Sequence, residues 1–271
     1  MLGRMHRFHV VDAFTDQPFR GNPAAVLVLD GPYDDAWAQR VAAEFNLSET
    51  AFVRPVTADG ADYELRWFTP RTEVDLCGHA TLAAAHVLVE HGAGGPFRFT
   101  SRSGVLTVTV RDGMLWLDFP ANPPYAKEVP DGLLAALGGE PVWAGFSDVG
   151  DYFVVYPDEA AVRALVPDLA AVERCTVRGV TVTAPADAAQ SHDFVSRLFA
   201  PAVGVPEDPV TGSAHTALGP YWAGRLGRTR LEAVQCSARG GRLTVELPDD
   251  APGRVRIGGK AVTVSEGTLR H

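Results

Sequence analysis

The side chains best suited to acid–base chemistry gather in a few short motifs. They are Glu49, Glu73, Asp75, His79, Glu207, Asp208 and His215. Carboxylates and imidazoles can remove a proton from a carbon acid, or return one, when their pKa lies near the working pH. Proton transfer on a small molecule is therefore the chemistry that these residues could perform.

Glu49 lies in Asn46-Leu-Ser-Glu-Thr50, between a predicted helix that ends near Phe45 and a predicted strand that begins near Thr50. The pKa of a carboxyl group at the entrance to a buried strand can rise, and the group can then act as a proton shuttle. A solvated loop glutamate fits the same pattern, and the pattern alone favours this second interpretation.

Cys77 and His79 flank Gly78 at the start of a predicted helix that extends to His91. The helix is apolar on nearly all sides, so we expect it to be buried. Burial disfavours a charged His79, which could donate a hydrogen bond as a neutral ring or simply cap the turn. Cys77 could act as a racemase base, since a helix N-terminus lowers the pKa of a thiol, or it could be an inert buried thiol. No second pair stands at zinc spacing, so we predict no metal site.

The segment around His79 recurs in the second half of the chain. Phe68-Thr-Pro70 precedes Glu73-Val-Asp-Leu-Cys-Gly-His-Ala80, and Phe199-Ala-Pro201 precedes Glu207-Asp-Pro-Val-Thr-Gly-Ser-Ala214. Each copy reads as a strand, a Phe-x-Pro turn, an acidic loop and a glycine that opens a helix of small residues. The recurrence suggests an internal duplication.

Gly78 and Gly212 each open one of these helices. The first amide groups of a helix have no partner within it, and glycine lets a ligand approach them closely. Such an N-terminus favours an anion. Two of them in one cleft would hold a small molecule with one or two carboxylates, although both glycines could instead serve close packing alone.

Composition sets outer limits on the function. The chain has 271 residues, a net charge of −9 and 46% hydrophobic residues, which is typical of a globular protein of one large or two small domains. No basic block is present, so we expect neither nucleic acid nor a membrane surface as a partner. Residues 1–11 hold no targeting signal and no stretch could span a membrane.

Cysteine and lysine usage narrows the setting further. Three widely spaced cysteines are typical of reduced thiols, and we expect a cytoplasmic protein. Only Lys127 and Lys260 are present, both in expected surface segments, which disfavours a pyridoxal-phosphate Schiff base. No phosphate loop, nucleotide fingerprint or Gly-x-Ser-x-Gly elbow occurs. The motifs therefore support neither pyridoxal phosphate, nor a bound nucleotide, nor a hydrolase elbow.

Local patterns predict the elements that must position the chemistry. Asp34-Asp35 can cap a helix that runs to Phe45, and Asp112-Gly113 between apolar runs predicts a hairpin. The proline-rich stretch 122–130 predicts a boundary between domain 1–121 and domain 122–271, with a last strand that could pair back onto the first domain.

Taken together, the motifs resemble the phenazine-biosynthesis PhzF family, within the wider diaminopimelate-epimerase-like fold. The matching segments are Asp12-Ala-Phe-Thr-Asp-Gln-Pro-Phe-Arg-Gly-Asn-Pro23, Asn46-Leu-Ser-Glu-Thr-Ala-Phe52, Arg66-Trp-Phe-Thr-Pro70, Asp75-Leu-Cys-Gly-His-Ala-Thr81, Glu207-Asp-Pro-Val-Thr-Gly-Ser-Ala-His215 and Gly258-Gly-Lys-Ala-Val262. The resemblance implies an α+β fold of two similar domains, each a strongly curved, mostly antiparallel sheet wrapped around a central helix. It also implies an active site between the domains, no cofactor and a homodimer.

The resemblance also implies roles for single residues. The characterised type isomerises trans-2,3-dihydro-3-hydroxyanthranilate by moving a proton, and its catalytic glutamate falls on Glu49. Substrate-contacting side chains fall on His79, Asp208 and Ser213, and backbone amides near Gly78 and Gly212 would hold the substrate carboxylate.

Three functions remain open at this stage. Epimerases of this fold carry one cysteine in each half, whereas this chain has Cys77 in the first motif but no cysteine in Asp208-Pro-Val-Thr-Gly-Ser213. An isomerase that uses Glu49 alone fits this pattern best. An epimerase or racemase that uses Glu49 and Cys77 is the second possibility, and a non-catalytic small-acid binding protein is the third. The substrate stays open.

Overall fold

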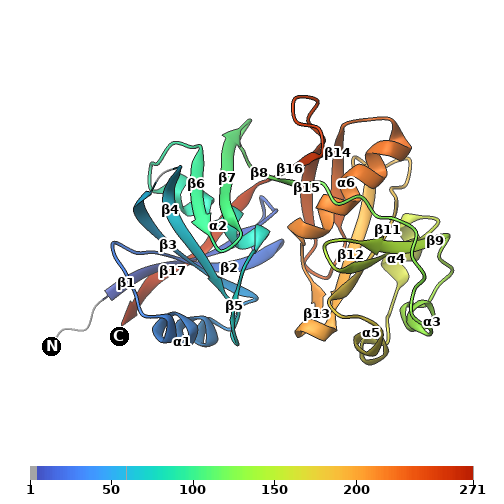
Figure 1. Cartoon of the computed structure of the whole chain (residues 1–271), viewed down its shortest axis with the longest axis horizontal. Helices are drawn as coiled ribbons and strands as arrows, with labels where there is room; N and C mark the ends of the chain where they lie inside the picture. The colour runs from blue at the N-terminus through green and yellow to red at the C-terminus, as the bar shows by residue number, and fades with distance from the viewer. Residues whose placement is uncertain (1–4, 59, 271) are drawn as a thin grey trace. The chain divides into compact units, whose positions relative to one another are not determined.

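The computed structural model describes residues 5–58 and 60–270. Residues 1–4, 59 and 271 lie outside the described residues. The first four belong to the stretch that was searched above for a targeting signal. No helix within the described ranges is long and apolar enough to cross a bilayer. The chain divides into two compact units, which we call unit 1 (Met1–Asp118 with Gly258–His271) and unit 2 (Phe119–Ile257) (Figure 1).

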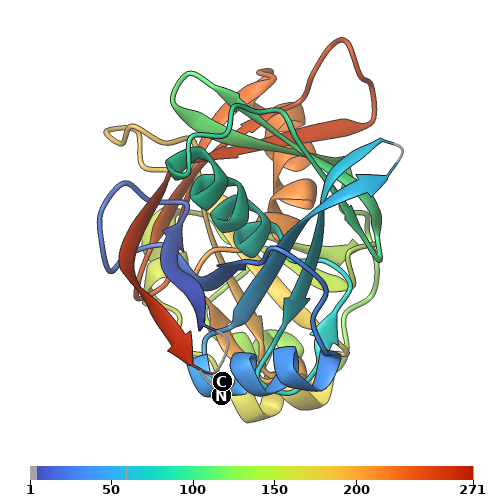
Figure 2. The ribbon, with the colours of Figure 1, turned by 90° about the vertical axis from the view of Figure 1, so that its left-hand side faces the viewer.

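Unit 1 is a mixed sheet folded around one helix. Its elements are β1 (Met5–Ala13), β2 (Asn22–Val28), α1 (Asp35–Phe45), β3 (Glu49–Ala58), β4 (Ala61–Phe68), β5 (Glu73–Val74), α2 (Gly78–Glu90), β6 (Phe97–Ser101), β7 (Gly104–Arg111), β8 (Met114–Pro120, which runs into unit 2) and β17 (Ala261–Arg270). β2 pairs with β3 and β4 with β6 in parallel, and the other pairings named for this unit are antiparallel. Figure 2 shows α2 enclosed by these strands.

Unit 2 repeats this arrangement. Its elements are α3 (Leu133–Leu137), β9 (Trp143–Ser147), β10 (Asp151–Val155), α4 (Glu159–Ala164), α5 (Leu169–Cys175), β11 (Gly179–Pro185), β12 (Phe194–Ala200), the short 3-10 helix η1 (Pro201–Val203), β13 (Val205–Asp208), α6 (Gly212–Leu226), β14 (Arg230–Gln235), β15 (Gly241–Glu246) and β16 (Arg254–Gly259, which ends in unit 1). β10 and β11 are parallel, as are β12 and β14, while β9–β10, β11–β12, β12–β13 and β14–β15 are antiparallel. The order of pairings is that of β1 to β7, as a duplication requires.

The central helices owe their burial to small side chains. Ala80, Ala83 and Ala84 of α2 are fully buried, so strands can approach this helix closely on several sides. Helix α6 contains Pro220, which has no amide hydrogen to donate to the carbonyl of Thr216. The amide of Asn122 donates to that carbonyl instead, at 2.9 Å. The proline therefore frees an acceptor that ties the start of unit 2 to its own central helix.

These observations confirm the predicted α+β fold class. The capping prediction for α1 is also confirmed, since the carboxylate of Asp34 accepts from the amide of Trp37 at 2.9 Å. The unit boundary falls after Asp118, three residues before the predicted domain limit at 121. The final strand, β17, pairs along the whole of β1, so the chain ends in unit 1.

Candidate active site

Three side chains of unit 1 meet where two parallel strands and the central helix begin. Asn22 is the first residue of β2, Glu49 is the first of β3 and His79 is the second of α2. The parallel pairing of β2 with β3 sets Ala24 beside Glu49, which brings the two strand starts together. Nε2 of His79 lies 3.3 Å from Oε2 of Glu49, and Nδ1 lies 3.2 Å from Nδ2 of Asn22. Sγ of Cys77 is 3.4 Å from the same Nδ1.

These contacts define the form of the His79 ring. An amide nitrogen can only donate, so the Asn22 amide donates to Nδ1, and Nδ1 is an acceptor. A neutral ring with an unprotonated Nδ1 carries its hydrogen on Nε2. Nε2 lies 3.3 Å from the carboxylate of Glu49, within ion-pair distance but without the geometry of a hydrogen bond.

Burial keeps this ring neutral. His79 is only 6% exposed, and desolvation lowers its pKa to about 3, against the opposing effect of a hydrogen bond with the backbone carbonyl of Pro23. At neutral pH the ring is thus a hydrogen-bond donor rather than a reservoir of protons. The side chain of Glu49 is 18% exposed and keeps access to the outside of the unit.

The same cluster offers donor atoms of a metal-binding kind. One ligand atom from each of Glu49, Cys77 and His79 lies within 4.8 Å of the others. Carboxylate, thiolate and imidazole together suit a transition-metal ion. However, an ion bound through one ring nitrogen would face either the thiol or the carboxylate, because these two groups face different nitrogens. The prediction that no metal is needed stays a prediction.

In unit 2, the predicted site residues lie around the start of α6. Asp208 ends β13, Thr211 is the N-cap residue, and Gly212 and Ser213 are the first two helical residues. The Thr211 hydroxyl donates to Oδ2 of Asp208 at 2.5 Å. The fully buried Gln235 donates to the Asp208 carbonyl at 2.7 Å and accepts from the Thr211 amide at 2.9 Å. Gln235 thereby holds the loop that presents Asp208.

Neither central helix has a side-chain cap at its N-terminus. The N-cap residues are Cys77 for α2 and Thr211 for α6, and neither side chain accepts from a first-turn amide. The predicted carboxylate-binding positions, Gly78 and Gly212, are the first residues of these two helices. No capping side chain therefore occupies the N-terminus of either α2 or α6, where the helix dipole favours an anion.

Ser213 has a partner that the motifs did not indicate. Nη2 of Arg178 donates to Oγ of Ser213 at 2.9 Å, and Nη1 of the same guanidinium donates to Oδ2 of Asp151. Asp151 is 1% exposed, and its burial raises the pKa of the carboxyl against the opposing charge of Arg178. The Ser213 hydroxyl thus accepts a hydrogen bond from an arginine that is ion-paired with the buried Asp151.

Two further acid–base candidates, Glu73 and Glu207, have structural roles. Glu73 accepts two hydrogen bonds from Arg66, at 2.7 and 2.8 Å. Glu207 accepts two from Arg197, at 2.7 and 3.1 Å. The two glutamates that the sequence repeat aligns therefore make the same bidentate pair in each unit, which holds β5 against β4 and β13 against β12.

His215 is likewise structural. Its Nδ1 donates to the carbonyl of Thr211 at 2.8 Å, just as the Thr81 hydroxyl donates to the carbonyl of Cys77 at 2.6 Å in unit 1. Each side chain braces the N-cap residue of its helix. Burial lowers the pKa of His215 to about 4, so this ring is neutral as well.

Sequence reasoning did not single out four of the residues that contact the predicted site. They are Asn22, Asp151, Arg178 and Gln235. Asn22 lies in the Arg-Gly-Asn-Pro stretch that carried part of the resemblance, so that motif was a usable signal. The other three stand in no motif.

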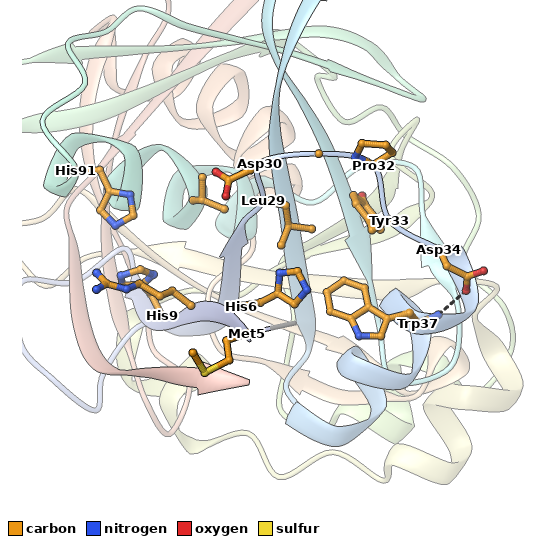
Figure 3. Close-up of a pocket in the computed structure, with 13 residues that line it drawn as sticks. Met5, His6, His9, Leu29, Asp30, Pro32, Tyr33, Asp34, Trp37 and His91 are labelled. Carbon is orange, nitrogen blue, oxygen red and sulfur yellow. Dashed lines mark hydrogen bonds between the residues drawn. The ribbon is translucent and has the colours of Figure 1, made fainter. Parts of the chain in front are cut away.

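A separate pocket of about 570 Å³ opens in unit 1 (Figure 3). Histidines and an aromatic pair line it, with the rings of His6 and Trp37 4.9 Å apart between their centroids. Glu49, Cys77 and His79 do not line this pocket. Its position is therefore distinct from the acid–base cluster.

Comparison with known proteins places this arrangement in a class. A hydroxyproline epimerase from Agrobacterium vitis shares the fold, with a TM-score of 0.61 at 13% identity over 98% of this chain and 93% of that one. The molecule therefore shares the fold of that epimerase.

Closer relatives define the family. The model of the phenazine biosynthesis-like protein family, PhzC-PhzF, matches residues 11–267. The crystal structure of a PhzF-family phenazine biosynthesis protein from Enterococcus faecalis has a TM-score of 0.91 and 44% identity, and the match covers 99% of this chain and 100% of that one. An uncharacterised isomerase of Pseudomonas aeruginosa is 54% identical over 261 residues, which is 96% of each chain. The chain belongs to the phenazine biosynthesis-like PhzF family.

Proposed function

We propose that this protein is a cofactor-independent isomerase that moves a proton on a small carboxylic acid, with Glu49 as the acid–base group. The observation that carries the proposal is the contact between Glu49 and a neutral His79 at the start of a buried helix, 3.3 Å from Nε2 to Oε2. The isomerase names of relatives such as the Pseudomonas aeruginosa protein support the same reaction class.

Glu49 acts by removing a proton from one carbon of the substrate and returning it to another. The electron pair left by the first step moves along the conjugated system, so atoms and charge balance without a further reactant. Nε2 of His79 lies 3.3 Å from the Glu49 carboxylate without forming a hydrogen bond, and we expect that bond to form when a ligand binds, because catalytic hydrogen bonds often tighten only then. Because His79 stays neutral, it does not compete with Glu49 for the proton.

The backbone amides near Gly78 in unit 1, and those near Gly212 in unit 2, each offer a binding position for a substrate carboxylate. Asp208 and Ser213 contact the remaining polar groups of the substrate. Trans-2,3-dihydro-3-hydroxyanthranilate is one candidate of this class, because it combines a carboxylate with an acidic C–H group beside a conjugated system.

Proton exchange in deuterated water tests the proposal directly. Dihydro-hydroxyanthranilate and a panel of small amino and hydroxy acids are incubated with the wild type, with Glu49→Gln and with Glu44→Gln, and NMR follows deuterium uptake. Glu44 is an exposed glutamate on α1 and serves as the matched control. We expect uptake into one compound, at least a thousandfold slower with Glu49→Gln and unchanged with Glu44→Gln.

Two results would contradict the proposal. Uptake that persists in Glu49→Gln would remove Glu49 from the role of the base. Binding of an acid without any exchange would indicate a small-acid binding protein instead.

The position of Cys77 supports a second candidate, an epimerase or racemase. Its Sγ lies 3.4 Å from Nδ1 of His79, which could accept the thiol hydrogen. The variant Cys77→Ala separates the two candidates. A racemase would lose inversion at the α-carbon, whereas the proposed isomerase keeps its proton transfer.

A further inference from the structure

The duplication allows the two units to be compared position by position. Unit 1 places Asn22 at the start of β2, Glu49 at the start of β3 and His79 as the second residue of α2. In unit 2 the corresponding strands are β10 and β11, which are also parallel, and the corresponding helix is α6. Three interacting side chains lie near these starts as well, although the strand registers place Gly179, one residue after Arg178, at the position of Glu49, and Asp151 at that of Ala24.

Those side chains are Asp151, Arg178 and Ser213. Asp151 begins β10, Arg178 directly precedes β11, and Ser213 is the second residue of α6. Pairing of Asp151 with Gly179 brings the two strand starts together, as Ala24 and Glu49 do in unit 1. Where unit 1 carries a carboxylate that faces an imidazole, unit 2 carries a guanidinium that faces a hydroxyl.

The guanidinium determines what the Ser213 hydroxyl can do. Arginine has only donors, so Oγ of Ser213 accepts from Nη2 of Arg178, at 2.9 Å. The hydroxyl hydrogen must then point elsewhere, and within residues 5–58 and 60–270 Oγ of Ser213 makes no hydrogen bond other than the one with Arg178. Ser213 is thereby held as a hydrogen-bond donor at the uncapped start of α6.

Asp151 and Arg178 differ in their exposure to solvent. The side chain of Asp151 is 1% exposed, whereas that of Arg178 is 32% exposed. The carboxylate therefore lies behind the guanidinium, and the exposed groups are N–H and O–H donors. Oδ1 of Asp151 has no hydrogen-bond partner within the described ranges, so the anchor of Arg178 depends on its other oxygen.

We propose that Arg178, anchored by the buried Asp151, is a positioning residue that fixes Ser213 as a donor and makes this end of the site specific for an ionised carboxylate. The proposal rests on the proposed function and adds a division of labour. Glu49 moves the proton, whereas Arg178 and Ser213 select the anionic group of the substrate.

Calorimetric titration with matched pairs of acids and amides tests this role. The probes are 3-hydroxyanthranilate, which is an unreactive aromatic analogue of the candidate substrate, benzoate, lactate and alanine, each beside its carboxamide. We expect the wild type to bind at least one acid more tightly than its amide. Arg178→Met then weakens binding of that acid at least tenfold and leaves binding of the amide within a factor of two.

Further variants separate positioning from general damage. Ser213→Ala weakens acid binding similarly, and the double variant is no weaker than the poorer single variant, since Arg178 acts through Ser213. Arg178→Lys keeps a charge and a donor, so it restores at least part of the preference for the acid even if Arg178→Met folds poorly. Arg163→Met removes an arginine from another buried carboxylate, Glu159, and leaves acid binding unchanged.

Three outcomes would overturn the proposal. They are a wild type that prefers no acid over its amide, an Arg178→Met variant that retains the preference, and additive losses in the double variant. Failure of the proposed function has a different signature, because Glu49→Gln would then keep its deuterium exchange while the affinities follow the expected pattern.

Discussion

Two buried histidines, His79 and His215, make the free energy of unfolding depend on pH. His79 and His215 each lie near the start of a central helix. Burial lowers their pKa values to about 3 and about 4, so both rings are neutral at pH 7. In the unfolded chain the same groups take up a proton near their ordinary value of about 6.5. Between these limits the unfolded state binds protons that the folded state excludes.

We therefore predict that the free energy of unfolding falls as the pH drops below about 6.5. Each histidine contributes up to about 1.4 kcal/mol per pH unit, and the loss continues until the pH reaches the folded-state pKa. His215→Asn keeps a donor for the Thr211 carbonyl but removes the titration. Urea unfolding at pH 6 and pH 5 should show a slope smaller by about 1 kcal/mol per pH unit in this variant.

The wild type, measured at the same two pH values, is the reference for this slope. An unchanged slope in His215→Asn would mean that the ring is already protonated in the folded protein.

Short-range chemistry decides the shape of individual elements. The turn between β7 and β8 has positive φ angles at Asp112 (54°) and Gly113 (71°), which matches the twist that a two-residue hairpin turn requires. No heavy atom lies within 4 Å of a Cβ added at Gly113, so the backbone conformation alone makes glycine favourable there. The predicted Asp-Gly hairpin has this physical basis.

We predict that Gly113→Ala lowers the stability by about 1 kcal/mol, because alanine is strained at positive φ. Gly31→Ala is the matched control, since an added Cβ meets no atom there either and the φ angle is not positive. Chemical denaturation should leave this control within about 0.5 kcal/mol of the wild type. Equal effects of both substitutions would contradict the backbone explanation.

The last strand, β17, completes the sheet of unit 1 by pairing with the first strand, β1. All nine residues of β1 have partners in β17, whereas five have partners in β2. Without β17, most of β1 would become an unpaired edge. The fold of unit 1 thus depends on residues more than 200 positions away from β1, as the pairing of Met5 with Arg270 illustrates.

A chain that ends at Lys260 should therefore lose order in unit 1 first. Hydrogen exchange should show protection of the β1 amides reduced at least tenfold in this truncation, because their hydrogen-bond acceptors are gone. Protection of β11 in unit 2 serves as the internal reference. Unchanged protection in β1 would show that β2 alone can hold that strand.

Much of the fold could be predicted because its signals are local. The cap at Asp34, the Asp-Gly turn and the glycine-led apolar helices each depend on neighbours a few residues apart. The repeat of Glu73 and Glu207 indicated the duplication, and the structure gives the two glutamates the same arginine pairing. The homodimer, the cytoplasmic location and the site roles stay predictions.

The sequence by itself determined the family, the fold class and the motifs in which Glu49, His79 and Ser213 lie. Only the tertiary structure decided which side chains face them. Asn22 reaches His79 across 57 residues, and Arg178 reaches Ser213 across 35. Such contacts depend on how parallel strands begin beside a buried helix, and no periodicity within one element records that. Long-range strand register therefore brings Glu49 to His79 in unit 1 and Arg178 to Ser213 in unit 2.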